Sequence, residues 1–204
     1  DTTLWFYTYQ RESNSARACS NLGNTYFKNK QYEAAIRMYK KSLTLPYSYP
    51  FIHFNLGATY EKVGLIDEAI EEYKASISRN NDNTLAFNNL GTVYDKQGLY
   101  DLAIEAYTNA LTDNPYFPLT HNNLGNTYEH IGNPEKAIAE YTAALKIDNN
   151  YADAHNNLGA MYLKKGILDK AIDELKKAAQ LKPDHQDAHY NLGIAYAMKG
   201  LYAD

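Results

Sequence analysis

The chain has 204 residues, of which 45% are apolar, 22% charged and 13% aromatic, a composition typical of a folded, soluble protein. Its 20 basic and 24 acidic residues give a net charge of −4, so no overall positive charge is available to hold nucleic acid by its phosphates. The single cysteine, Cys19, excludes internal disulfides and multi-cysteine zinc sites, and no run approaches the ~18 apolar residues of a membrane span. We therefore expect no nucleic-acid partner and no direct membrane insertion by this segment.

The elements predicted in chain order repeat with a period of 34 residues. The tripeptide Asn-Leu-Gly recurs at that spacing at 21–23, 55–57, 89–91, 123–125, 157–159 and 191–193. Residues 1–15 fit the second helix of a preceding partial repeat. Complete repeats then cover 16–49, 50–83, 84–117, 118–151 and 152–185, and residues 186–204 supply the first helix of a truncated sixth. We expect twelve helices: five pairs, with a single helix at each end, in one array cut from a longer one.

Each repeat has the pattern of two helices that approach each other closely. A tyrosine follows each Asn-Leu-Gly glycine by three residues, and an alanine comes nine residues later in the five complete repeats. Four residues after that alanine stand Tyr39, Tyr73, Tyr107, Tyr141 and Leu175. Glycine inside a helix costs about 1 kcal/mol relative to alanine. Its recurrence therefore predicts a close contact between the two helices of a pair, and it indicates that most of the tyrosine is packing material.

Leu-Gly-x-x-Tyr, then Ala-x-x-x-Tyr, then proline in two repeats (Pro115 and Pro183), resembles the tetratricopeptide repeat along essentially the whole chain. The resemblance implies an all-α solenoid of antiparallel helix pairs, wound as a right-handed superhelix with a concave groove. It also implies a non-catalytic scaffold that binds an extended protein or peptide segment along that groove. The position usually held by tryptophan departs from the pattern and carries Cys19, His53, Phe87, His121, His155 and His189.

No motif of a known enzyme class stands out, so we expect no catalytic residue, no cofactor and no metal. Histidines that occupy one repeat position lie on helices about 10 Å apart, too far to share a metal ion. We interpret them as filling the tryptophan position. The remaining metal candidate is His185 with His189, beside Asp184 and Asp187, and it is not favoured.

The candidate binding residues lie at recurring positions of the first helices. Position 6 is asparagine in every repeat: Asn21, Asn55, Asn89, Asn123, Asn157 and Asn191. A carboxamide carries both a donor and an acceptor, so such a ladder suits an extended peptide held by its backbone. It resembles the asparagine ladder in the tetratricopeptide arm of O-GlcNAc transferase. The alternative is that these asparagines hydrogen-bond neighbouring helices within the array.

The other predicted groove residues are Asn24, Asn126, Phe54, Asn88, Asn122, Asn156, Lys62, Lys96 and Lys164. With Lys28, the three lysines form a predicted basic stripe at position 13. Phe51, Phe54, Leu85 and Leu119 suggest an apolar wall along the second to fourth repeats. The carboxylate clamp of chaperone-tail receptors is not expected, because groove positions 5 and 6 carry no lysine or arginine.

Two other functions stay open. The array could be the substrate-recruiting arm of a larger enzyme, such as a glycosyltransferase, or a module that associates with itself end to end. Thr3-Leu4-Trp5 and Ala16-Arg17 also resemble a junction in membrane proteins of the mannosyltransferase-like class, whose repeats lie outside the cytoplasm. The compartment is left open: cytoplasmic by default, extracytoplasmic if the parent protein is membrane-anchored.

Overall fold

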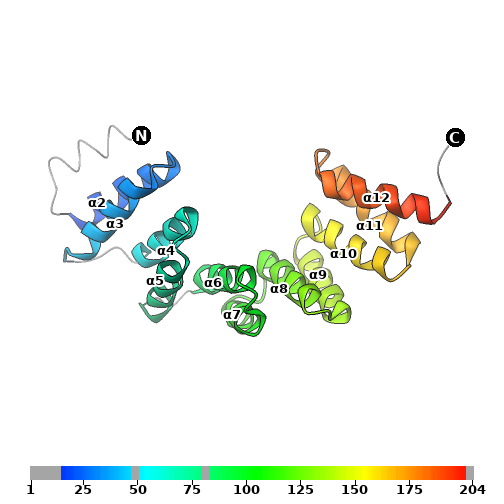
Figure 1. Ribbon diagram of the computed structural model, residues 1–204, viewed down its shortest axis with the longest axis horizontal. Helices are drawn as coiled ribbons and strands as arrows, with labels where there is room; N and C mark the ends of the chain where they lie inside the picture. Colours follow the sequence, from blue (N-terminus) through cyan, green and yellow to red (C-terminus); the bar gives the residue numbers. More distant parts are fainter. Residues whose placement is uncertain (1–14, 47–50, 80–82, 201–204) are drawn as a thin grey trace. The chain divides into compact units, whose positions relative to one another are not determined.

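The computed structural model describes residues 15–46, 51–79 and 83–200, and every regular element among these residues is an α-helix (Figure 1). They form two compact units, one ending at Gln97 and the other beginning at Gly98. The all-α fold of helix pairs predicted from the sequence is confirmed. The helix predicted within 1–15, and residues 201–204, lie outside the described residues.

The first unit contains two helix pairs followed by a single helix. Its helices are α2 (Ala16–Lys28), α3 (Tyr32–Leu43), α4 (Ile52–Val63), α5 (Ile66–Arg79) and α6 (Thr84–Lys96). Helices α2 and α3 pack together, as do α4 and α5, and α6 packs against α5. Figure 1 shows the two members of each pair running antiparallel, and this arrangement brings α2, α4 and α6 to the same side of the unit.

The second unit begins with a single helix and continues with two pairs and a last helix. Its helices are α7 (Tyr100–Asp113), α8 (Pro118–His130), α9 (Pro134–Ile147), α10 (Ala152–Lys164), α11 (Leu168–Leu181) and α12 (Gln186–Met198). Each helix packs against the next one in the chain, and α10 also contacts α12. None of the described helices is both long enough and apolar enough to cross a membrane.

In the pairs α2–α3, α4–α5 and α8–α9 the two helices meet where the glycine of Asn-Leu-Gly faces a tyrosine ring, and in α10–α11 that glycine faces Leu175. A Cβ placed on Gly23 would stand 2.6 Å from Cε1 of Tyr39, and one on Gly125 would stand 2.6 Å from Cε1 of Tyr141. Both tyrosines are fully buried. The recurrent glycine is therefore required because the ring occupies the space of a side chain, and the close contact predicted from the sequence is confirmed.

The turn that follows a first helix uses a left-handed residue at one repeat position. Glycine occupies this position with φ between 69° and 81° at Gly64, Gly98, Gly132, Gly166 and Gly200. In the first described repeat the same position is Lys30, with φ of 59°. A side chain on a left-handed residue costs about 1 kcal/mol, so this turn is strained relative to the others.

Candidate functional site

We call the side formed by the first helices of the repeats the first-helix face: α2, α4 and α6 in the first unit, and α8, α10 and α12 in the second. All six ladder asparagines lie on this face and are partly exposed: Asn21, Asn55, Asn89, Asn123, Asn157 and Asn191. Partial exposure leaves them accessible to solvent while allowing contact with neighbouring helices.

In the first unit, Asn24 joins two helix pairs. Its Oδ1 atom accepts a hydrogen bond from the Tyr39 hydroxyl at 2.7 Å and another from Nδ2 of Asn55 at 3.0 Å. Burial raises the pKa of Tyr39 well above its ordinary value, so the hydroxyl keeps its proton and remains a donor. One ladder asparagine is therefore already bonded to the preceding repeat.

The next junction has a different chemistry because Ala58 stands where Asn24 stands one repeat earlier. Here the Tyr73 hydroxyl donates to Oε2 of Glu61 at 3.2 Å and accepts from Nδ2 of Asn89 at 3.3 Å. Burial, together with the charge of Glu61, raises the pKa of Tyr73. The tyrosine hydroxyl thus replaces the missing amide and keeps the two repeats connected.

The second unit carries a longer chain of amide hydrogen bonds. Nδ2 of Asn191 donates to Oδ1 of Asn156 at 3.1 Å, and Nδ2 of Asn156 donates to Oδ1 of Asn157 at 3.2 Å. Nδ2 of Asn157 then reaches Oδ1 of Asn122 at 3.1 Å and Oδ1 of Asn126 at 3.0 Å. The alternative considered for the ladder, bonding between neighbouring helices, therefore occurs in this structure. Both N–H groups of Asn157 are used within the protein.

The asparagines at position 5, which the sequence pattern predicts as groove residues, are buried in the structure. Asn88, Asn122 and Asn156 are only 2%, 5% and 7% exposed. Asn122 and Asn156 lie at the junctions between successive first helices, where they accept from the next ladder asparagine. Their carboxamides hold the repeats together, and a ligand on the surface would not reach them.

The lysines predicted as a basic stripe divide into two kinds. Nζ of Lys96 lies 2.7 Å from Oε1 of Glu61, and Nζ of Lys164 lies 2.5 Å from Oε1 of Glu129, so each is neutralised by the preceding repeat. Lys28 and Lys62 are exposed and form no ion pair with any other described residue. The available positive charge on this face is therefore found in the first unit.

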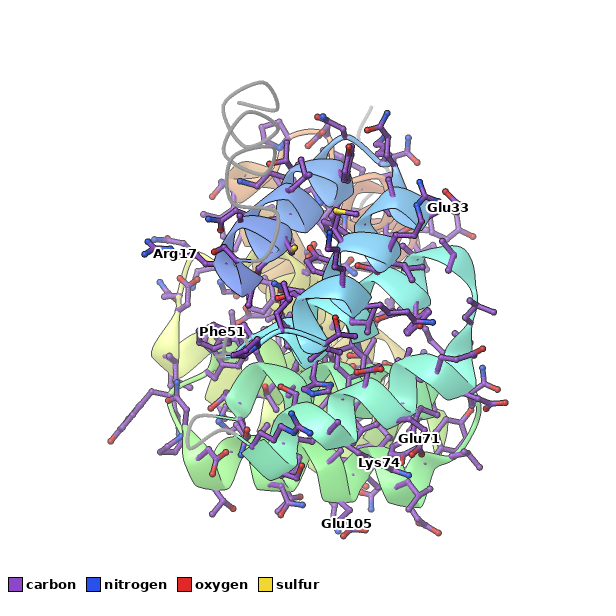
Figure 2. All side chains as sticks on the ribbon, turned by 90° about the vertical axis from the view of Figure 1, so that its left-hand side faces the viewer. Arg17, Glu33, Phe51, Glu71, Lys74 and Glu105 are labelled. Atoms are coloured by element: carbon purple, nitrogen blue, oxygen red, sulfur yellow. The ribbon has the colours of Figure 1, made fainter. Side chains whose placement is uncertain are left out.

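A pocket of about 330 Å³ opens on the first-helix face between α2 and α4. It is lined by Asn24, Phe27 and Lys28 of α2, Phe54, Asn55 and Ala58 of α4, and Tyr39 of α3. Three predicted groove residues, Asn24, Phe54 and Asn55, thus come together in one cavity. The apolar wall residues Phe51 and Leu85 do not line this pocket, although each is 51% exposed. Figure 2 shows Phe51 at the start of α4.

Three of the histidines at the tryptophan position lie within hydrogen-bond distance of a glutamate. Nδ1 of His121 lies 2.7 Å from Oε2 of Glu140, while its Nε2 lies 3.1 Å from the carbonyl oxygen of Pro115. Two acceptors facing both ring nitrogens favour the imidazolium form, and the hydrogen bond to Glu140 raises the pKa of His121. His53 and His155 approach Glu72 and Glu174 in the same way.

The remaining polar candidates have structural roles. Nδ1 of His185 accepts from the backbone N–H of Ala188 and caps α12, and Nε2 of His189 lies 2.9 Å from the carbonyl oxygen of Pro183. In the part of the chain that the structure describes, no three potential metal ligands gather at one point. Cys19 is buried, and burial raises the pKa of its thiol.

Sequence reasoning missed Phe27 as a wall of the pocket, as well as the glutamates that neutralise two of the lysines. The signal for the ion pairs was present, because Glu61 and Glu129 each precede their lysine by 35 residues. That separation is one repeat plus one residue. The hydrogen bonds of the tyrosine hydroxyls were also missed. The repeat spacing predicts that the tyrosine rings are buried, but it does not indicate which asparagine side chains their hydroxyls contact.

Comparisons with known families agree with the repeat geometry. Family models described as "TPR repeat" match residues 23–64, 130–166 and 161–200, which together exceed half of the chain. Models described as "Tetratricopeptide repeat" match 52–83, 84–117 and 106–139. The chain belongs to the tetratricopeptide repeat family. Tetratricopeptide repeats are generally non-catalytic interaction modules, so membership of the family supports a protein-interaction scaffold.

Solved tetratricopeptide structures resemble most of the chain. YrrB, described as "a TPR protein with an unusual peptide-binding site", is 24% identical over 93% of this chain and 98% of its own, with a TM-score of 0.69. TTC0263, a thermophilic protein of Thermus thermophilus, is 23% identical over 90% of this chain and 100% of its own, with a TM-score of 0.68. None of the curated proteins matches the sequence significantly.

A third structure contains a bound peptide. The first tetratricopeptide domain of Spaghetti (RPAP3), bound to the HSP90 peptide SRMEEVD, is 25% identical over 57% of this chain and 93% of its own, with a TM-score of 0.56.

Proposed function

We propose that this tetratricopeptide chain binds an extended peptide segment of a partner protein on its first-helix face. The observation that carries the proposal is the pocket between α2 and α4, because residues selected from the repeat pattern alone line it together. A volume of about 330 Å³ is at the small end of ligand-binding pockets, which suits one side chain and its flanking backbone.

Two structural relatives support a peptide ligand. YrrB is described as having a peptide-binding site, and the RPAP3 domain is bound to a peptide. On this chain, the ladder amides contribute less than a fully free ladder would, since Asn55 and Asn157 already donate to neighbouring repeats. The bonded asparagines are held in place, so their remaining groups are oriented before a ligand arrives. We therefore assign them a secondary role in contacting a peptide backbone.

A selection from a library of displayed random peptides tests the proposal directly. Purified wild-type chain would be compared with Ala58→Trp, which fills the pocket, and with Glu71→Trp, an equally bulky change on α5. Figure 2 shows Glu71 next to Lys74 on α5, and Glu71 lies outside the pocket. We expect peptides selected on the wild type to bind Glu71→Trp equally and to bind Ala58→Trp at least about tenfold more weakly.

Circular dichroism and thermal unfolding would establish that both variants are folded. Because the indole at position 58 could disturb α4, Phe54→Ala provides a second way of changing the pocket without adding volume. Failure to select any peptide, or equal binding to wild type and both pocket variants, would overturn the proposal.

A further inference from the structure

The frame of the pocket occurs twice in the chain. Three repeats after Asn24, Tyr39, Asn55 and Ala58 stand their counterparts Asn126, Tyr141, Asn157 and Ala160. Two hydrogen bonds are shared: tyrosine hydroxyl to Oδ1 at 2.7 Å and 2.8 Å, and ladder Nδ2 to that Oδ1 at 3.0 Å in both units. In the second unit Tyr141 also donates to Glu129, and Asn157 also donates to Asn122. The two units therefore present comparable polar frames on which other side chains differ.

The side chains that flank these hydrogen-bonded residues are apolar in the first unit and polar in the second. Phe27 and Phe54 of the first unit correspond to Glu129 and Asn156 of the second. Glu129 is paired with Lys164, and Asn156 belongs to the amide chain. An apolar wall is therefore specific to the first unit.

Each aromatic wall packs against another ring, and three polar atoms of the pocket, Oδ1 of Asn24, Nδ2 of Asn55 and the Tyr39 hydroxyl, are bonded to one another. Phe27 meets Tyr32 edge to face at 5.7 Å between ring centroids, and Phe54 packs against Tyr73 at 6.0 Å. Oδ1 of Asn24 already accepts two hydrogen bonds. Because the acceptor of the frame is satisfied, the pocket favours apolar surface over another polar group.

The charge beside the pocket is positive and available. Lys28 lines the pocket, and Lys62 stands at the same position one repeat later. The nearest acidic side chain on that stretch of α4, Glu61, is neutralised by Lys96. Packed helices are about 10 Å apart, which is the length of about three residues of extended chain. Two lysines at that spacing match carboxylates on an extended peptide.

From these features we infer that the first unit selects an extended peptide segment in which one bulky apolar residue has Asp or Glu within about three residues of it. The apolar side chain enters the pocket between Phe27 and Phe54, and the carboxylates lie against Lys28 and Lys62. A free C-terminal carboxylate is not required. This inference rests on the proposed function and adds the chemistry of the peptide.

The peptides selected on the wild-type chain, sequenced as a population, provide the test. We expect enrichment of a Phe, Leu or Met together with nearby Asp or Glu. A fluorescein-labelled peptide of the enriched sequence should bind Lys28→Glu/Lys62→Glu about tenfold more weakly, and its affinity should fall as salt is added. Arg37→Glu/Lys74→Glu is the matched control, because it makes the same charge change on α3 and α5 and should bind normally.

A second variant tests the apolar wall with a residue that the chain already carries at this repeat position. Phe54→Asn introduces the residue that the second unit carries at the same position, on a frame that shares two hydrogen bonds with the first unit. It should weaken binding about thirtyfold and abolish the preference for a bulky apolar residue when the selection is repeated.

The outcomes separate this inference from the function on which it rests. Selected peptides that depend on Ala58 and Phe54 but carry no acidic bias would overturn the inference and leave the proposed function standing. Acidic peptides that bind Lys28→Glu/Lys62→Glu as tightly as wild type would also overturn it. If no peptide were selected at all, both would fail.

Discussion

Gly125 lies against the ring of Tyr141 so closely that a Cβ on the glycine would stand 2.6 Å from Cε1 of the tyrosine. A real Cβ essentially never approaches that closely, and Tyr141 is fully buried with no open side to move toward. The contact joins α8 to α9, so a residue that weakens a helix is the one that lets these two helices pack closely.

Gly125→Ala should destabilise the chain by about 1–2 kcal/mol, because overpacking outweighs the gain in helix propensity. Gly193 is the matched control: it occupies the same repeat position in α12, where an added Cβ meets no atom of the described residues within 4 Å. Gly193→Ala should be neutral or stabilising by up to about 1 kcal/mol. Urea unfolding of the two variants gives the comparison, and equal effects would contradict this account of the glycine.

Asn157→Ala should destabilise the chain by about 1–3 kcal/mol, because Oδ1 of Asn122, which is buried, loses its donor from the next repeat. Asn21→Ala is the control, since the Asn21 side chain makes no hydrogen bond with any other described residue. Its effect should stay within about 0.5 kcal/mol. The measurement is again the free energy of unfolding in urea, and a neutral Asn157→Ala would show that the amide chain contributes no stability.

Lys30→Gly should stabilise the chain by about 0.5–1 kcal/mol, because glycine adopts positive φ without the steric cost that a lysine bears. The reverse change, Gly132→Lys, places a lysine on a residue with φ of 72° and should cost a similar amount. Thermal unfolding of both variants and of the wild type measures the two changes in stability. A loss of stability in Lys30→Gly would mean that the lysine side chain makes a contribution larger than the strain at its backbone.

The stability contributed by His121 should depend on pH. The hydrogen bond to Glu140 raises the folded-state pKa of His121 above its ordinary value of about 6.5. A raised pKa means that the contribution is fully present below pH 6.5 and is lost as the pH rises through the folded pKa. The unfolding free energy of wild type should therefore exceed that of Glu140→Gln at pH 5.5, and the difference should shrink at higher pH.

Urea unfolding of both proteins at constant ionic strength from pH 5.5 to pH 8.5 measures this difference. Comparing the two proteins cancels the pH-dependent contributions that both share. A difference that grew with pH would contradict the assignment of the imidazolium to His121.

The helix pairs and their closest contacts could be predicted from the amino-acid sequence. The 34-residue spacing of Asn-Leu-Gly and the alanine–tyrosine spacing recur often enough to identify both helices of a repeat. Recurrence of glycine inside a helix identified Gly23 and Gly125 as points of close approach, because only a steric requirement explains a residue that weakens the helix. These features recur in each 34-residue repeat, so a single sequence shows the same pattern several times.

The hydrogen-bond and ion-pair partners of the polar residues in that pattern could be determined only from the tertiary structure. Asn55 and Asn157 donate to residues 31 positions earlier, and Lys96 and Lys164 pair with residues 35 positions earlier. Such contacts depend on how one repeat is placed against the next, which the composition of a single repeat does not specify. For the same reason Asn122 is buried although its residue type suggested exposure, and Phe27 and Phe54 line one pocket that joins two repeats.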